Sequence, residues 1–246
     1  MEVALDRSRN RQVAPAKGEA ETKLRVLQLS AFAGLTLPSR DAFLELAKVE
    51  QLARRTRLAD QGEPAKHFVI LGSGRVRVER MSAGRAFPLG HRGPGETVGE
   101  TAIIGSAAAS ESATVVDEGQ ALVLPMAGIR RLVASDPALR IAMAVALVDR
   151  QRATEERLES LLLHGVEARL VDFLFSAHRR WAADHASGEL IAAPFTHADI
   201  ALLIGSTRET VTLLLGKLKR AGLIQFDRRR IVIRDRAGLE QRAVAS

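Results

Sequence analysis

The segment at residues 195–233 constrains this chain most, because it predicts two short helices joined by a tight turn and followed by a basic hairpin. Thr196 suits the N-cap of the first helix, and Asp199 suits the positive end of its first turn. Gly205 can take the left-handed conformation that ends a helix. The apolar residues of this helix recur at the spacing of one helical face: Ile200, Leu203 and Ile204.

A second helix is predicted from Thr207 to Arg220, with Ser206 as its N-cap candidate. Its inward-facing residues are Val211, Leu214, Leu215 and Leu218. Its start and outer side carry Thr207, Arg208, Glu209, Thr212 and Leu213. This layout is typical of a helix-turn-helix, whose second helix enters the DNA major groove. Arg208 can donate two hydrogen bonds to a guanine, and Glu209 can accept one from a cytosine amine.

The hairpin that follows is predicted to be a wing with a basic tip, formed by Arg228, Arg229 and Arg230. Between Leu203 and Arg236 the sequence has nine Lys or Arg residues and three Asp or Glu residues, a local net charge of +6. A phosphate-binding face requires such an excess. An ordinary helical hairpin with a solvated charged side is the alternative, and the basic wing counts against it.

These residues resemble the C-terminal domain of the CRP/FNR family of bacterial transcription regulators, and the resemblance extends from about Phe43 to Ile233. It implies an α+β fold with an N-terminal cyclic-nucleotide-binding-type β-roll, a long dimerisation helix and a C-terminal winged helix-turn-helix. It also implies a homodimer on a two-fold DNA site with TGTGA-like half-sites, and RNA polymerase as a further partner.

The resemblance carries over to individual positions of the recognition helix. Arg208 and Glu209 match base readers of the family, while a third reader, normally an arginine, aligns with Leu213. Leucine cannot pair with guanine but can touch a thymine methyl, so we expect the half-site to be altered there. The predicted base contacts are Thr207, Arg208, Glu209 and Leu213. The predicted phosphate contacts are Thr196, His197, Arg228, Arg229 and Arg230.

Residues 49–124 show short strands separated by turn residues, a pattern that favours an all-β roll or barrel. Within it, residues 95–100 (GETVGE) resemble the start of the family's ligand-binding cassette. Gly99 and Glu100 match the positions that cradle the phosphate and bind the ribose. The family's Arg-Ser/Thr pair falls on Glu111 and Ser112, or on Ser110 and Glu111, and neither register supplies a cation.

A carboxylate at Glu111 would repel a phosphodiester by about 1 kcal/mol or more in a partly buried site. We therefore expect the fold to be retained without a dependence on cyclic AMP, and no cofactor to be required. The alternative is a sensor of a cyclic nucleotide or cyclic dinucleotide with a rearranged pocket, in which Arg85 or Arg92 replaces the missing arginine.

A long helix is predicted from Asp136–Pro137 to about His164, a length of roughly 40 Å. Its coiled-coil-like seam is predicted to comprise Met143, Leu147, Gln151, Thr154, Leu158 and Leu161. The flanking charged residues, Arg150 among them, suit solvated or interchain positions. The alternative is a helix packed only on its own chain. Thr154 also matches one of two family hydroxyls that reach the nucleotide base, while Glu155 replaces the other.

The composition excludes several classes of site. The chain has no cysteine, which rules out disulfides and thiolate metal sites. Its six histidines show no ligand spacing, so we expect no metal site. We find no catalytic motif and expect no enzyme. No apolar run reaches membrane-spanning length, and we expect a cytoplasmic protein without membrane contact.

The chain is predicted to divide into a flexible tail (1–25), a β-roll domain (26–135), a dimerisation helix (136–164), a winged helix-turn-helix (165–236) and a C-terminal tail (237–246). A nucleotide-binding module whose winged helix contacts proteins is the alternative from another functional class. The net charge of +7 and its concentration near the wing favour DNA.

Overall fold

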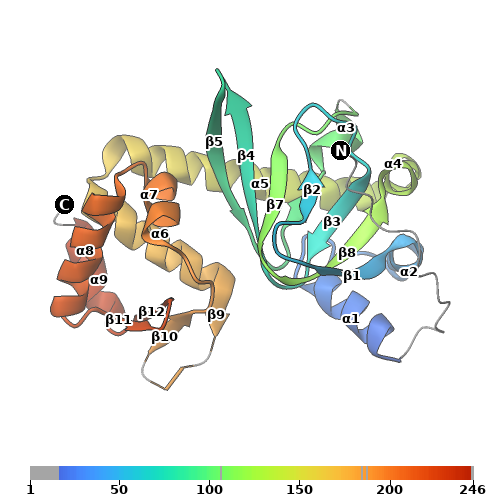
Figure 1. The fold of residues 1–246 in the computed structure, drawn as a ribbon. Coiled ribbons are helices and arrows are strands. Elements are labelled where there is room, and N and C mark those ends of the chain that lie inside the picture. The colour runs from blue at the N-terminus through green and yellow to red at the C-terminus, as the bar shows by residue number, and fades with distance from the viewer. Residues whose placement is uncertain (1–16, 106, 184, 187, 245–246) are drawn as a thin grey trace.

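The computed structural model describes residues 17–105, 107–183, 185–186 and 188–244. An N-terminal β-roll domain and a C-terminal domain lie side by side, and the long helix α5 (Pro137–Leu163) runs along both of them (Figure 1). The predicted α+β class, with a β-roll, a long helix and a helix-turn-helix, is confirmed.

Two antiparallel four-stranded sheets form the β-roll. The first has the order β1-β8-β3-β6, comprising β1 (Lys48–Leu52), β8 (Gly119–Pro125), β3 (His67–Leu71) and β6 (Thr97–Val98). The second has the order β2-β7-β4-β5, comprising β2 (Arg57–Ala59), β7 (Ser112–Asp117), β4 (Arg75–Ser82) and β5 (Arg85–Arg92). Strand β3 is apolar and buried from Phe68 to Leu71 because both its faces are covered. Val69 and Leu71 pack with the valines of β4, and Phe68 and Ile70 pack with the helices.

Within the described residues, four short helices complete the N-terminal domain: α1 (Lys17–Gln28), α2 (Leu37–Leu46), α3 (Thr101–Ile104) and α4 (Met126–Ser135). Helix α2 begins two residues before the predicted cap at Ser39. Its N-cap is Thr36, because Pro38 fits the first turn of a helix instead of blocking it. Phe43 of α2 stacks on Phe32 with ring centroids 5.2 Å apart, at the centre of the helical core.

The prediction of a flexible tail at residues 1–25 is wrong for residues 17–25, which belong to α1. Val26 and Leu27 at the end of this helix are buried against the β-roll. Lys23 bonds the carbonyl of Leu44 at 3.2 Å. Because the sequence of α1 is mostly polar, its pattern did not indicate these buried contacts. Residues 1–16 of the predicted tail lie outside the described residues.

The C-terminal domain contains α6 (Val166–Trp181), α7 (His197–Ile204), α8 (Arg208–Arg220) and α9 (Arg236–Val244). Its sheet has the order β11-β12-β10-β9, comprising β11 (Ile224–Asp227), β12 (Arg230–Ile233), β10 (Glu189–Ile191) and β9 (Ala182–Ala183). One apolar core joins α6, α7 and α8 to the strands.

The prediction of a C-terminal tail at residues 237–246 is also wrong over most of its length, because α9 reaches Val244. Leu239 is completely buried in the core of the domain, and Arg242 pairs with Glu167 of α6 at 3.5 Å. Because Leu239 is a single buried apolar residue in a charged stretch, the sequence shows no helical periodicity there. Residues 245–246 lie outside the described residues.

Candidate functional site

The helix caps and the turn glycine between α7 and α8 are as predicted, except for the N-cap of α8. Thr196 and Asp199 form a reciprocal capping box at the start of α7. Gly205 has φ +62°, and a Cβ added there would lie 2.9 Å from the Leu161 side chain. The N-cap of α8 is Thr207 and not Ser206, because the Thr207 hydroxyl accepts from the Thr210 amide.

Helix α8 buries one face and exposes the other, as predicted. The buried residues are Val211, Leu214, Leu215 and Leu218. The predicted base readers Arg208, Glu209 and Leu213 are exposed, and so is Thr207 beside them. Leu213 is 56% exposed although it is apolar, which leaves it available to a thymine methyl. His197 at the start of α7 bonds the Thr212 hydroxyl at 2.8 Å. The outer face of α8 can therefore enter a groove.

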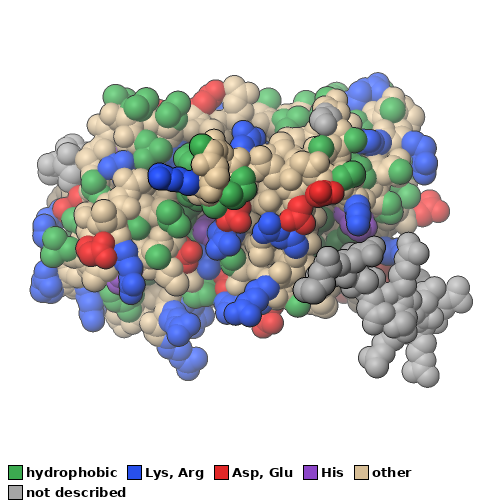
Figure 2. Space-filling view, turned by 45° about the horizontal axis from the view of Figure 1, so that its top comes forward, with side chains coloured by type: hydrophobic (Ala, Val, Ile, Leu, Met, Phe, Trp, Pro, Cys, Tyr) green, Lys and Arg blue, Asp and Glu red, His purple; other side chains and the backbone are tan. Residues whose placement is uncertain are grey.

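The wing is the β11–β12 hairpin, with Arg228 and Arg229 at its turn. Arg228 has φ +55°, a conformation that L-residues seldom adopt. Neither Arg228 nor Arg229 has an ion-pair partner within the described ranges, whereas Arg230 pairs with Asp227 at 3.0 Å. Lysine and arginine side chains line the outer edge of this domain (Figure 2). Two of the three predicted tip arginines are thus free for phosphate.

The β-roll cassette brings Gly99, Glu100, Glu111 and Ser112 together. Gly99 has φ +95°, and a Cβ there would lie 2.7 Å from the His67 carbonyl oxygen. Glu100 and Glu111 are nearly inaccessible, at 1% and 4% exposure. Ser112 accepts from the Gln61 amide at 3.1 Å. Two carboxylates therefore lie buried in the pocket where the resemblance implies a carboxylate and a cation.

Arg150 of α5 supplies a cation to this pocket, although its place in the sequence predicted a solvated or interchain position. Its guanidinium donates to both Glu100 and Glu111. Burial lowers the pKa of Arg150 to about 10, with Arg92 and Arg80 acting in the same direction. Burial raises the pKa of Glu111, against the opposing charges of Arg92 and Arg80. These residues are far apart in sequence, so no motif could reveal the contact.

The two arginines predicted as replacements, Arg85 and Arg92, differ in position. Arg92 lies at the pocket, 4.0 Å from the Glu111 carboxylate, whereas Arg85 is exposed at the far end of β5. Thr154 is exposed on α5 and donates its hydroxyl to the Arg150 carbonyl at 2.9 Å. Glu155 accepts from Gln151 at 2.8 Å.

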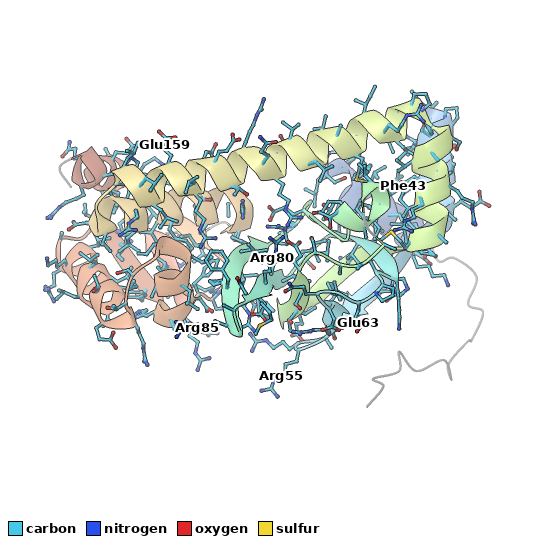
Figure 3. The ribbon with its side chains drawn as sticks, turned by 90° about the horizontal axis from the view of Figure 1, so that it is seen from above. Phe43, Arg55, Glu63, Arg80, Arg85 and Glu159 are labelled. Carbon is cyan, nitrogen blue, oxygen red and sulfur yellow. The ribbon has the colours of Figure 1, made fainter. Side chains whose placement is uncertain are left out.

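Helix α5 exposes an apolar stripe, but it is not the predicted seam. Met143 is completely buried in its own domain, so its assignment to the seam is wrong. Leu161 is half-buried and packs against the turn at Gly205, and its assignment to the seam stays a prediction. Leu147 is half-buried, and Leu158 is exposed as predicted. The exposed stripe comprises Ile141, Ala144, Val148, Gln151, Glu155, Leu158 and Leu162. It follows spacings of three and four on the exposed face of α5, and Figure 3 shows both domains on one side of this helix.

The two domains contact each other through buried polar groups. Arg157 of α5 donates to the Leu89 carbonyl of β5 at 2.9 Å and to the Leu203 carbonyl of α7 at 3.1 Å. His91 is buried with its ring 5.6 Å from that of Phe195, and neither ring nitrogen has a partner among the described residues. The β-roll, α5 and α7 are thus linked directly.

Lowering the pH is expected to destabilise this contact through His91. Burial, followed by the charge of Arg75, lowers the pKa of His91 from 6.5 to about 3. The unfolded chain therefore binds more protons, so stability is complete above pH 6.5 and falls as the pH approaches 3. We expect a loss of about 2 kcal/mol between pH 6.5 and pH 5.

Urea unfolding at both pH values tests this expectation with His91→Phe and, as a control, His67→Gln in β3. The wild type and the control should lose stability on acidification, and His91→Phe should lose about 2 kcal/mol less. An equal pH dependence in all three proteins would show that His91 titrates normally.

Among the described residues, no three His, Asp or Glu side chains gather so as to hold a metal ion. No helix in the described part of the chain combines the length and the apolar character needed to cross a membrane.

The comparisons with known proteins match both parts of the chain. A family model described as a Crp-like helix-turn-helix domain matches residues 168–242, and one described as a cyclic nucleotide-binding domain matches residues 49–136. The CRP-like cAMP-activated global transcriptional regulator of Mycobacterium tuberculosis is 28% identical over 74% of this chain and 82% of its own length.

Two further similarities extend over most of the chain. The global nitrogen regulator of Synechococcus elongatus is 27% identical over 79% of this chain and 89% of its own length. The structure of TTHB099, a CRP-family transcriptional regulator from Thermus thermophilus, superposes with a TM-score of 0.66 at 29% identity. It covers 79% of this chain and 96% of that one.

Proposed function

Because this chain belongs to the CRP/FNR family of transcription regulators, we propose that it binds a two-fold DNA site as a homodimer and needs no cyclic AMP to do so. The chain has the DNA-binding helix-turn-helix of the family, and its relatives are regulators and not enzymes. The observation that carries the proposal is the exposed outer face of α8, with Arg208, Glu209 and Leu213 beside a basic wing.

The proposed base readers are Thr207, Arg208, Glu209 and Leu213, and the half-site is TGTGA-like with a change where Leu213 replaces an arginine. Thr196, His197 and the wing arginines supply phosphate contacts in this proposal. Arg228 and Arg229 are better candidates for phosphate contacts than Arg230, because Arg230 already forms an ion pair with Asp227. RNA polymerase is the further partner that such a regulator would contact.

Independence from cyclic AMP is supported by the pocket. The Arg150 guanidinium already binds Glu100 and Glu111, so the chain's own ion pairs use the groups that would meet a ribose and a phosphate. A phosphodiester placed beside Glu111 would have to compete with that carboxylate for Arg150. This arrangement favours a protein whose DNA-binding form does not require the nucleotide.

One observation favours the alternative of an effector-gated sensor with a rearranged pocket. Arg92 lies 4.0 Å from Glu111, and Arg80 donates to the neighbouring Ser110 carbonyl at 3.1 Å. If Glu111 moved, three arginines would surround the vacated position, and an anionic cyclic nucleotide or cyclic dinucleotide could bind there.

Fluorescence anisotropy on a TGTGA-type palindrome, with a scrambled duplex at the same salt concentration, separates these functions. Tight specific binding without added nucleotide supports the proposal. Binding that requires cyclic AMP, cyclic GMP or cyclic di-GMP supports the alternative. Weak and equal binding to both duplexes with every nucleotide would refute both.

Arg208→Ala is expected to weaken binding to the palindrome by about 1–3 kcal/mol and to relax the preference at one G·C pair, since a bidentate guanine contact is lost. Arg220→Ala, an exposed arginine in the last turn of α8, is the matched control. Titrations against single-base variants of the site measure the preference. If Arg208→Ala weakened all sequences equally, Arg208 would contact only phosphate.

A further inference from the structure

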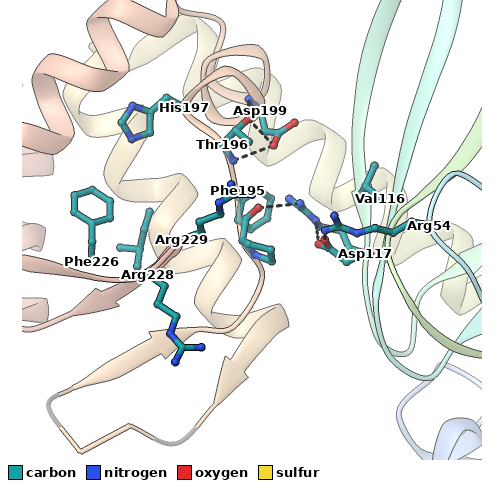
Figure 4. A pocket seen from close by; sticks show the side chains of 13 residues that line it. Arg54, Val116, Asp117, Phe195, Thr196, His197, Asp199, Phe226, Arg228 and Arg229 are labelled. Carbon is teal, nitrogen blue, oxygen red and sulfur yellow. Dashed lines mark hydrogen bonds and ion pairs between the residues drawn. The ribbon is translucent and has the colours of Figure 1, made fainter.

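A cavity of about 680 Å³ opens between the β-roll and the wing, separate from the cassette pocket. Arg54, Arg75 and Asp117 line it from the β-roll, and Phe195, Arg228 and Arg229 line it from the C-terminal domain. Figure 4 shows the Arg54–Asp117 pair on one side, the wing arginines on the other and Phe195 between them. Its volume is within the range of small-molecule sites.

Arg75, which lines this cavity, has a hydrogen-bond donor without a partner among the described residues. Its side chain is only 5% exposed, and its Nε donates to Asp117 at 2.7 Å while Nη2 donates to the Pro194 carbonyl at 3.1 Å. The guanidinium also lies 4.2 Å from the centroid of the Phe195 ring. The remaining nitrogen, Nη1, has no partner among the described residues. A buried N–H without an acceptor is costly, so an acceptor in the cavity would be stabilised.

The charge of the cavity is also unbalanced. Four arginines line it against two carboxylates, Asp117 and Asp199. Asp117 is shared between Arg54, at 2.6 Å, and Arg75. Asp199 is already bonded to Thr196 in the cap of α7. A net charge of +2 therefore remains, of which the lining residues of each domain contribute +1.

We propose that this cavity is an anion site that takes a phosphate group and thereby ties the β-roll to the DNA-binding domain. Guanidinium groups favour phosphate because their planar donors match its oxygens. Two sources have this chemistry: a small phosphorylated ligand and the DNA backbone. In both cases Arg54 and Arg75 hold the anion from one domain and Arg229 holds it from the other.

The first experiment is calorimetric titration of the full chain with inorganic pyrophosphate. Arg54→Ser removes a lining guanidinium. Arg55→Ser removes the adjacent one, which projects from the β-roll into solvent and does not line the cavity (Figure 3). If a small anion occupies the site, Arg54→Ser weakens binding about tenfold, the loss of one charge-assisted contact, while Arg55→Ser leaves it unchanged.

The second arm compares a duplex confined to the two half-sites with one extended by about one helical turn on each side. If the phosphate comes from DNA, Arg54→Ser weakens binding to the extended duplex alone, again by about tenfold, while pyrophosphate binds no variant. The wild-type affinity for the short duplex tests the proposed function separately. If Arg54→Ser and Arg55→Ser behave alike in both arms, the cavity is not a phosphate site and the inference is overturned.

Discussion

Replacing both Val148 and Leu158 by glutamate is expected to make the protein monomeric and to weaken its binding to a two-fold DNA site by about a hundredfold or more. These side chains are 45% and 55% exposed on the exposed stripe of α5. Pairing two such stripes would bury them, and two glutamates per chain would oppose that pairing. A monomer can contact only one half-site at a time, so the added affinity from binding two linked half-sites is lost.

Leu163→Glu is the matched control, because Leu163 is 72% exposed on the same helix but lies outside the stripe. Sedimentation gives the oligomeric state, and anisotropy on duplexes with one or two half-sites gives the affinities. We expect the double variant to bind both duplexes equally and the control to retain its preference for two. A double variant that stayed dimeric would place the interface elsewhere.

Arg150→Met is expected to lower the free energy of unfolding by about 3 kcal/mol at neutral pH. The change leaves Glu100 and Glu111 buried without their shared cation. Arg92, 4.0 Å from Glu111, and Arg80, whose charge also acts on Glu111, remain near it. Methionine keeps much of the side-chain volume, so the loss reports the missing charge more than missing packing.

The pH dependence distinguishes this cause from a packing defect. Burial already raises the pKa of Glu111 above 4.5, and removing Arg150 raises it further. The folded state then favours the protonated carboxyl, so the penalty is small below pH 4.5 and grows as the pH rises to the raised pKa. We expect the difference between Arg150→Met and the wild type to shrink on acidification.

Urea unfolding measures these differences, with Arg152→Met, an exposed arginine on α5, as the control. Adding Glu100→Gln and Glu111→Gln to Arg150→Met should recover much of the lost stability, because no buried charge then lacks a partner. Equal stability of Arg150→Met and Arg152→Met at neutral pH would show that the Arg150 ion pairs contribute nothing.

The sequence by itself determined the elements that carry recognition. The period of α8, the capping box of Thr196 and Asp199 and the left-handed Gly205 depend on residues within one or two helical turns of each other. These local features can therefore be predicted without knowledge of the rest of the chain. The same holds for the wing, whose two short strands and turn lie within residues 224–233.

Only the tertiary structure decided which side chains meet. Arg150 lies 50 residues from Glu100 and 39 from Glu111, and Arg75 lies 119 from Pro194. The apolar pattern predicted that α5 is a long helix. Which face of α5 stays exposed depends on its packing against the β-roll and α7, and Met143 is buried in that packing. Local periodicity fixes how side chains are spaced along a helix, whereas the direction in which they point depends on what packs against it.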